Sequence, residues 1–222
     1  TLRADQVHAY GFPLESTPNL DSLAERGALF ETAIAASSRT VPSHASMFSS
    51  RWVREHSVGT FNGSSRLEDV ETLAEQFRAA GYETAAFVSN FVLKRRTGLD
   101  RGFDVYDDEL PALEINRQGH FERLAEDTTR RVLAWLSRDR GDRPIFVWVH
   151  YQDPHGPYAA PASFAESLDL GPPGADPELP VLDRDTGRAG IPRYQALPGA
   201  RADAQEVQMR ELIFEERPIS ST

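Results

Sequence analysis

The spacing of apolar residues predicts alternating helices and strands through most of the chain. The segment Thr17–Gly27 has a capping threonine, a proline at the first helical position and a closing glycine, which is typical of a short helix. We expect this helix to pack through Leu20, Leu23 and Ala24. The stretch Ala28–Ser37 is apolar and β-tolerant and predicts a strand, and Pro42 then indicates that a helix begins near Thr40.

Two more pairs of a helix and a strand follow. The segment Ser65–Gly81 opens with a capping-box pattern and carries apolar residues on one helical face, and Glu83–Ser89 after it is typical of a strand. Another amphipathic helix is predicted over Phe121–Ser137, before the continuous apolar run Ile145–Val149, which is typical of a strand buried on both faces. This alternation predicts an α/β protein with a largely parallel sheet.

The periodic pattern ends after Pro161. Residues 171–199 are rich in proline and glycine and contain few large apolar residues, which predicts a long loop or excursion. We therefore divide the chain into a folded portion, 1–161, and a portion, 162–222, that leads into the next segment of the same domain. Because the chain opens on Thr1 without a lead-in and ends without a closing element, we expect it to be an internal piece of a larger domain.

Composition and charge narrow the possible classes of protein. None of the 222 residues is cysteine, which excludes a disulfide framework, a thiolate zinc site and a cysteine nucleophile. The 34 acidic and 24 basic residues give a net charge of −10, so we expect no nucleic-acid partner, because clustered Lys and Arg bind phosphate backbones. No apolar run reaches about 18 residues, so we expect no membrane-spanning segment. The cellular compartment stays open.

Three polar segments follow predicted strands, where open α/β sheets bind their ligands. In Ser38–His44 a hydroxyl would lie in the positive field of a helix N-terminus, although its Thr and Ser residues could equally cap the helix. Asn90 could donate to an anion or form a turn. The loop His150–Tyr158 places two His and an Asp between Pro and Gly, and could hold a general acid or be a simple turn.

Other charged or imidazole groups are weaker candidates. His56 is more readily interpreted as structural than as a site residue. The acidic cluster between Asp104 and Glu109 lacks the spacing and the central glycine of a calcium loop, so we expect a solvated face. The basic run Lys94–Arg96 is expected to lie on the surface.

Five blocks, in order, resemble the N-terminal half of sulfatase-family enzymes in the alkaline phosphatase superfamily. The blocks are TLRAD, STPNLDSLAERGALFETAIAASSRTVPSHASMFSS, ETLAEQFRAAGYETAAFVSNFVL, GLDRGFDVYDDEL and FVWVHYQDPHGPY. The resemblance runs in register from Thr1 to about Pro161. It implies a three-layer sandwich around a large mixed, mostly parallel sheet, of which this chain would hold a part. It also implies hydrolysis or transfer of sulfate or phosphate esters at a metal-bearing site.

The resemblance further implies roles for four residues. The family motif Cys-or-Ser, x, Pro, Ser, Arg corresponds to Thr40–His44, and Thr cannot be converted to formylglycine as Cys or Ser is. Related phosphodiesterases and phosphoglycerol or phosphoethanolamine transferases use an unmodified Thr, so Thr40 would be both nucleophile and metal ligand. His155 would assist the leaving group or bind an ester oxygen. His44, in place of the motif Arg, and Asn90 would position the anion.

The metal and the substrate are also implied only in part. The ion would be Ca²⁺, Mg²⁺, Mn²⁺ or Zn²⁺, and its other ligands in the family come before the first block and after Pro161. Because hard cations take about six oxygen ligands, we expect this chain alone to bind the metal poorly and to be inactive. The substrate would be a small-molecule or a glycan- or lipid-linked anionic ester, with phosphorus somewhat favoured over sulfate. The alternative is a non-catalytic relative that serves binding or structure.

Overall fold

The chain divides into two compact units, which are described separately here. The computed structural model describes residues 2–59, 66–113, 121–155 and 164, and the structural statements below concern these residues. The first unit comprises Thr1–Leu29, Ile115–Arg117 and Asp153–Thr222, and the second comprises Phe30–Glu114 and Gln118–Gln152. The predicted excursion over 162–222 lies outside the described residues, apart from Phe164.

The described part of the first unit consists of short helices, namely η1 (Ala4–Gln6), η2 (His8–Tyr10) and α1 (Pro18–Arg26). The start of α1 is held by polar contacts, because Thr17 Oγ1 accepts the N–H of His8 at 3.0 Å and donates to Asp21 Oδ1 at 3.1 Å. The helix was predicted at these residues, but the predicted packing is wrong. Leu20 and Leu23 are 43% and 62% exposed, because the contacts that hold α1 are polar and lie at its first turn.

A parallel sheet forms the centre of the second unit. Its three strands run in the order β2 (Val105–Asp107), β1 (Glu83–Phe87) and β5 (Ile145–Val149). Ala86 on the central strand pairs with Tyr106 on one side and with Trp148 on the other. A separate antiparallel pair joins β3 (Ala112–Leu113) to β4 (Phe121–Glu122). The parallel strands with intervening helices confirm the predicted α/β class.

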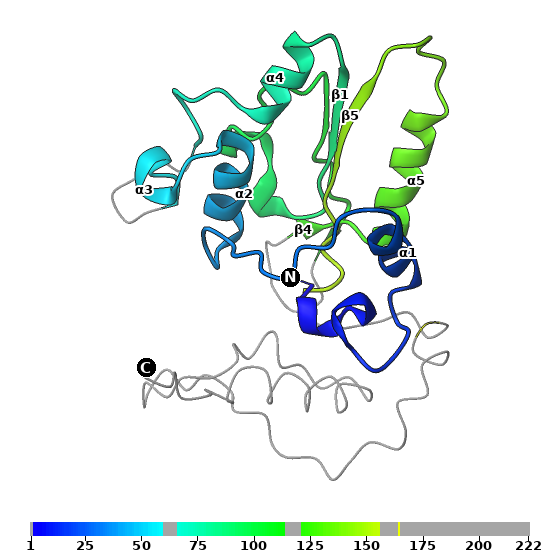
Figure 1. Cartoon of the computed structure of the whole chain (residues 1–222). Helices are drawn as coiled ribbons and strands as arrows, with labels where there is room; N and C mark the ends of the chain where they lie inside the picture. Colours follow the sequence, from blue (N-terminus) through cyan, green and yellow to red (C-terminus); the bar gives the residue numbers. More distant parts are fainter. Residues whose placement is uncertain (1, 60–65, 114–120, 156–163, 165–222) are drawn as a thin grey trace. The chain divides into compact units, whose positions relative to one another are not determined.

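Helices cover both faces of this sheet (Figure 1). On one face lie α2 (Thr40–Ser49) and α4 (Leu73–Ala79), and on the other lies α5 (Ala125–Leu136). Because side chains alternate along a strand, each strand contributes to two cores. The core beside α2 and α4 includes Ala86, Val88, Tyr106, Phe146 and Trp148, and the core beside α5 includes Ala85, Phe87, Val105, Val147 and Val149.

Two strand predictions need correction. Ala28–Ser37 forms neither strand nor helix, because a strand needs a neighbouring backbone and this segment pairs with none of the described strands. The strand Ile145–Val149 is confirmed, but it is half-buried rather than buried on both faces. Its residue Ile145 is 38% exposed, because β5 has a pairing partner on one edge only within the described residues.

Two helices begin later than predicted. Asp69 has a φ of 55°, which a right-handed helix cannot include, so α4 begins after Thr72 rather than near Ser65. The capping box is formed by Thr72 and Glu75, whose side chains each accept the other residue's backbone N–H, at 3.2 and 2.8 Å. The helix predicted from Phe121 begins at Ala125, because Phe121 pairs with β3 instead.

Other short helices complete the described second unit, namely α3 (Val53–His56), η3 (Phe91–Leu93) and η4 (Arg95–Thr97). The longest described helix, α5, has 12 residues. No helix in the described ranges is both long and apolar enough to cross a membrane.

Candidate active site

The carboxyl ends of the three parallel strands bring polar residues from separate parts of the chain into the second unit's candidate site. Ser89 and Asn90 follow β1, Asp107 ends β2, and His150 follows β5. Ligands of open α/β sheets bind at this edge. The candidate site therefore comprises this edge and the N-terminus of α2.

Thr40 is the first residue of α2, and its side chain is exposed. The N-cap position belongs to Arg39, so Thr40 does not cap the helix, and Ser43 lies within it. An α-helix leaves its first N–H groups without an acceptor inside the helix. In α2 these groups belong to Thr40 and Val41, because Pro42 has no N–H and the N–H of Ser43 donates to Arg39 O at 3.1 Å. The hydroxyl of Thr40 thus lies beside donors that suit an anionic oxygen.

His44 lies one turn further along α2 and is half-buried. Its Nδ1 is 2.8 Å from Thr40 O, and its ring lies 5.4 Å from the Trp148 ring and 5.6 Å from the His150 ring. Burial lowers the pKa of His44, which favours the neutral ring. A neutral ring bound to a carbonyl carries its proton on Nδ1, so Nε2 is an acceptor until the ring is protonated.

Asn90 is 6% exposed, and its side chain takes part in a turn. Its Oδ1 accepts the N–H of Val92 at 2.9 Å at the start of η3, and its backbone forms an isolated bridge with Glu122. The amide oxygen is therefore engaged locally, as the turn interpretation predicts, whereas the donors that an anion would need are on Nδ2.

The two histidines of the loop that follows β5 belong to different units. His150 belongs to the second unit, where its N–H donates to Phe87 O at 2.9 Å and its carbonyl accepts from Ser89 Oγ at 2.6 Å. His155 is half-buried and belongs to the first unit, so it is not placed relative to Thr40. Sequence reasoning emphasised His155, but the imidazole that the structure brings beside His44 is that of His150. Its position directly after a strand was the available signal.

The weaker candidates have structural partners. His56 is buried, with Nε2 2.9 Å from Ser46 Oγ and Nδ1 accepting the N–H of Val58 at 3.0 Å. The interpretation of His56 as structural is thus supported by its contacts.

The acidic cluster is a solvated face only in part, because Asp104 and Glu109 are exposed while Asp107 and Asp108 are half-buried and paired with arginines. Asp107 accepts from Arg123 at 2.7 Å and from Arg131 at 2.9 Å, and Asp108 forms an ion pair with Arg95 at 3.4 Å. The Arg95 guanidinium also lies over the Tyr106 ring, 5.4 Å from its centroid, so this basic residue is more than a surface charge. The prediction failed for Asp107 and Asp108 because their arginine partners come from other segments of the chain.

The metal implied by the resemblance has no ligand set among the described residues. Within the described ranges, no group of three or more His, Asp or Glu side chains could hold a metal ion. The Thr40 hydroxyl is thus not accompanied there by the oxygen ligands that a hard cation needs. The described residues alone do not fit the ion.

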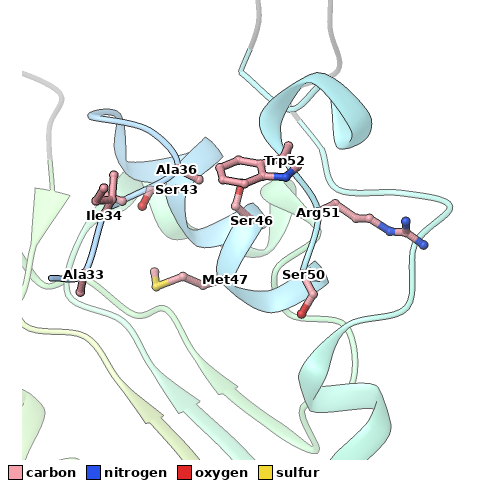
Figure 2. Close-up of a pocket in the computed structure, with 10 residues that line it drawn as sticks. Ala33, Ile34, Ala36, Ser43, Ser46, Met47, Ser50, Arg51 and Trp52 are labelled. Atoms are coloured by element: carbon pink, nitrogen blue, oxygen red, sulfur yellow. The ribbon is translucent and has the colours of Figure 1, made fainter. Parts of the chain in front are cut away.

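An apolar groove of about 590 Å³ opens beside α2 (Figure 2). Residues 33–36 line it together with α2 and the segment that follows, and Ile34, Met47 and Trp52 there are 90%, 58% and 62% exposed. Arg51 is the one charged residue in the lining. This lining suits an apolar group rather than a sulfate or phosphate, so the anion site is better sought at the N-terminus of α2.

Comparison with known families identifies the class of protein. The sequence matches the family model described as Sulfatase over residues 1–179. The chain therefore belongs to the sulfatase family, and the family resemblance seen in the sequence is confirmed.

The curated relatives are longer than this chain. The uncharacterized sulfatase YidJ of Escherichia coli K12 is 27% identical, with 75% of this chain and 39% of the relative covered. The arylsulfatase of Klebsiella aerogenes is 25% identical, with 65% and 39% covered. The N-acetylglucosamine-6-O-sulfatase of Bacteroides thetaiotaomicron is 26% identical, with 67% and 28% covered. The chain thus spans about two fifths or less of the length of these relatives.

Solved structures agree on the fold. The phosphonate monoester hydrolase of Agrobacterium radiobacter aligns with a TM-score of 0.60 at 19% identity, covering 79% of this chain and 44% of that structure. A protein in complex with its substrate D-glucosamine-2-N,6-O-disulfate aligns with a TM-score of 0.59 at 21% identity, covering 79% and 37%. The periplasmic domain of EptC from Escherichia coli, in complex with Zn, aligns with a TM-score of 0.52 at 18% identity. The alignment covers 79% of this chain and 49% of that structure. These likenesses confirm the alkaline phosphatase/sulfatase-like fold class.

Proposed function

We propose that the protein hydrolyses or transfers sulfate or phosphate esters, with Thr40 as the nucleophile. The observation that carries this proposal is the place of Thr40, an exposed hydroxyl on the first residue of a ten-residue helix. The adjacent helix N–H groups and the helix dipole would stabilise negative charge on the non-bridging ester oxygens. Membership of the sulfatase family supports the same chemistry.

In this reaction Thr40 Oγ releases its proton to solvent water and attacks sulfur or phosphorus in line. The bond from Oγ to that atom forms as the bond to the leaving alcohol oxygen breaks, and the leaving oxygen takes up a proton. We propose that His155 donates this proton to the leaving oxygen. Water, or an acceptor alcohol in a transferase, then takes the group from Thr40 and restores the hydroxyl.

We assign the binding of the ester anion to His44 and Asn90. Both lie in the second unit, His44 on the first turns of α2 and Asn90 after the central strand. An anion beside the His44 ring would favour its protonated form, which donates through Nε2. A substrate of the sulfated-sugar kind, like that bound by one structural neighbour, or a phosphonate ester, like the substrate class named for another, would present such an anion.

Dependence on a divalent metal belongs to the proposal, with Thr40 as one ligand. It is supported by the family membership and by the Zn complex of one structural neighbour. The described residues do not by themselves supply the other ligands of the ion.

Removal of the Thr40 hydroxyl tests whether it is the nucleophile. We expect Thr40→Ala to lower ester turnover on the order of a thousandfold or more, because the reacting oxygen is removed. Because this chain alone is expected to be inactive, turnover would be measured on a protein that carries it together with the family segments that hold the other metal ligands. The substrates would be p-nitrophenyl sulfate, bis(p-nitrophenyl) phosphate and p-nitrophenyl phenylphosphonate, each with Ca²⁺, Mg²⁺, Mn²⁺ and Zn²⁺. Thr40→Ser should keep part of the activity, since it keeps the hydroxyl.

Thr129→Ala is the matched control, because Thr129 lies on α5, and its hydroxyl contacts Tyr151 at 3.0 Å. It should leave turnover unchanged. Full turnover in Thr40→Ala would exclude Thr40 as the nucleophile. A wild-type protein without turnover in every combination would instead favour the non-catalytic alternative.

A further inference from the structure

Arg123 is a buried cation at the carboxyl edge of the sheet, 1% exposed. Its guanidinium donates to acceptors from α5 and from the ends of β1 and β2: Nε to Thr128 Oγ1 at 3.1 Å, Nη1 to Asp107 Oδ1 at 2.7 Å and to Glu109 O at 3.1 Å, and Nη2 to Val88 O at 3.0 Å and to Asp107 O at 3.4 Å. A guanidinium has five N–H donors, and these contacts use all of them. Arg123 therefore has no donor left for a substrate.

A chain of hydrogen bonds leads from Arg123 to the strand on the other side of β1. Arg123 Nε donates to Thr128, whose hydroxyl oxygen lies 2.8 Å from Ser89 Oγ, and Ser89 Oγ donates to His150 O at 2.6 Å. Thr128 Oγ1 also donates to Leu124 O at 3.1 Å, so the two hydroxyl protons are shared among three contacts and either hydroxyl can be the donor between Thr128 and Ser89. Ser89 and Thr128 are both fully buried, so water does not compete for these bonds.

The groups at the ends of this network are candidate site residues. The backbone of His150 is fixed by Ser89, and its ring lies 5.6 Å from the His44 ring on α2. The N–H of Arg123 also donates to Ser89 O at 3.1 Å, directly before Asn90. One buried side chain thus connects the ends of β1, β2 and β5.

We propose that Arg123 is a positioning residue, which holds His150 and Asn90 in register with His44 and Thr40. It acts through Val88, Ser89 and Thr128 and does not touch the ester. The inference rests on the proposed function, because the register of these groups matters for catalysis only if the edge binds the ester. Preorganised placement is worth a large factor in rate, since a displacement of about 1 Å can lower turnover about a hundredfold.

The test compares three variants of the protein used in the Thr40 assay. Arg123→Met removes the positive charge and the N–H donors of the guanidinium. Ser89→Ala removes the hydroxyl that donates to the carbonyl of His150. Arg131→Met is the matched control, because Arg131 also binds Asp107 but is 39% exposed and its ion pairs are with Asp107 and Glu109. Folding is checked by circular dichroism, and the ring signals of His44 and His150 are recorded by ¹H–¹³C NMR. Turnover is measured with the best ester from the Thr40 assay.

We expect Ser89→Ala and Arg123→Met to shift the ring signals of both histidines and to lower kcat about tenfold to a hundredfold at nearly constant KM. Arg131→Met should leave the ring signals in place and kcat within about twofold. If Arg123→Met does not fold, the ring signals and the kcat of Ser89→Ala decide whether the inference holds. Unchanged ring signals in folded Ser89→Ala, or equal losses in Arg131→Met, would overturn the inference. If the wild type turns over no ester, the proposed function fails, while the ring signals still test the positioning.

Discussion

His56 shows how a histidine can be committed to structure rather than chemistry. Its Nδ1 accepts the N–H of Val58, so the neutral ring carries its proton on Nε2 and donates to Ser46 Oγ. Protonation of Nδ1 would break the bond to Val58 inside a buried site. Burial accordingly lowers the pKa of His56, against a smaller opposing effect of the Glu55 carboxylate.

The lowered pKa of His56 predicts how stability depends on pH. Below the ordinary histidine pKa of 6.5 the unfolded chain binds a proton that the folded chain does not, so the free energy of unfolding is greatest above that pH. It should fall as the pH drops from 6.5 toward the lowered pKa. Urea unfolding at several pH values between 5 and 8 measures this.

His56→Gln is the variant that isolates this contribution, because Gln can still donate to Ser46 but does not titrate. It should flatten the pH dependence without abolishing it, since burial also lowers the pKa of His44. Parallel curves for the variant and the wild type would contradict the assignment to His56.

Elements whose own residues determine their conformation were predicted well from the sequence. The strands β1 and β5 and the helix α1 agree closely with their apolar runs and their Pro and Gly signals. The failures depend on distant partners or on single backbone angles. The pairing of Phe121 with Leu113 and the positive φ of Asp69 leave no periodic signal in the chain.

Gly102 illustrates a backbone requirement that only the packed elements reveal. It has a φ of 87°, and a Cβ there would lie 2.2 Å from Glu75 N in the first turn of α4. We predict that Gly102→Ala lowers the free energy of unfolding by about 2–5 kcal/mol, from the left-handed conformation and from the forced separation of α4. Denaturant titration of the variant and the wild type measures the difference.

Gly141→Ala provides the comparison for Gly102→Ala. Gly141 also has a positive φ, of 59°, but a Cβ there would meet no atom within 4 Å. Gly141→Ala should therefore lower the free energy of unfolding by about 1–2 kcal/mol, from the left-handed backbone conformation alone. Equal losses at the two glycines would show that the contact with α4 does not matter.

The candidate site was predicted in part, because it combines local motifs with long-range pairing. Thr40 and Asn90 could be located from the strand ends and the helix start that precede or contain them. The hydrogen bond from Arg123 to Val88 O could not be predicted, since 35 residues separate the two. An arginine in a polar segment is ordinarily predicted to face water. The sequence pattern indicates which residues are polar, but it does not predict which polar residues are buried together.

The ion pair of Asp107 with Arg123 connects the sheet to the segment that precedes α5. Arg123 has no exposed side-chain surface and Asp107 has 14%. Burial alone would raise the pKa of Asp107, but hydrogen bonds from Arg123 and Arg131 outweigh it and lower the pKa. The stabilisation from Asp107 is therefore present above its unfolded pKa of about 3.8 and is lost as the pH falls through the lowered value.

Asp107→Asn should thus destabilise the whole second unit at neutral pH. The variant leaves the buried Arg123 charge without its carboxylate, and removal of one partner of a buried pair costs about 3–5 kcal/mol. Glu109→Gln removes a carboxylate that also binds Arg131 but is 78% exposed, so its loss should be about 1 kcal/mol or less. Urea unfolding of both variants at pH 7 and pH 3 measures the two losses and their pH dependence. Below about pH 3.8 the unfolded wild-type chain takes up a proton on Asp107 that the folded chain does not, so the wild type loses part of this stabilisation at pH 3 and its difference from Asp107→Asn should narrow. Equal losses for the two variants at pH 7 would mean that the buried pair does not hold the sheet to α5.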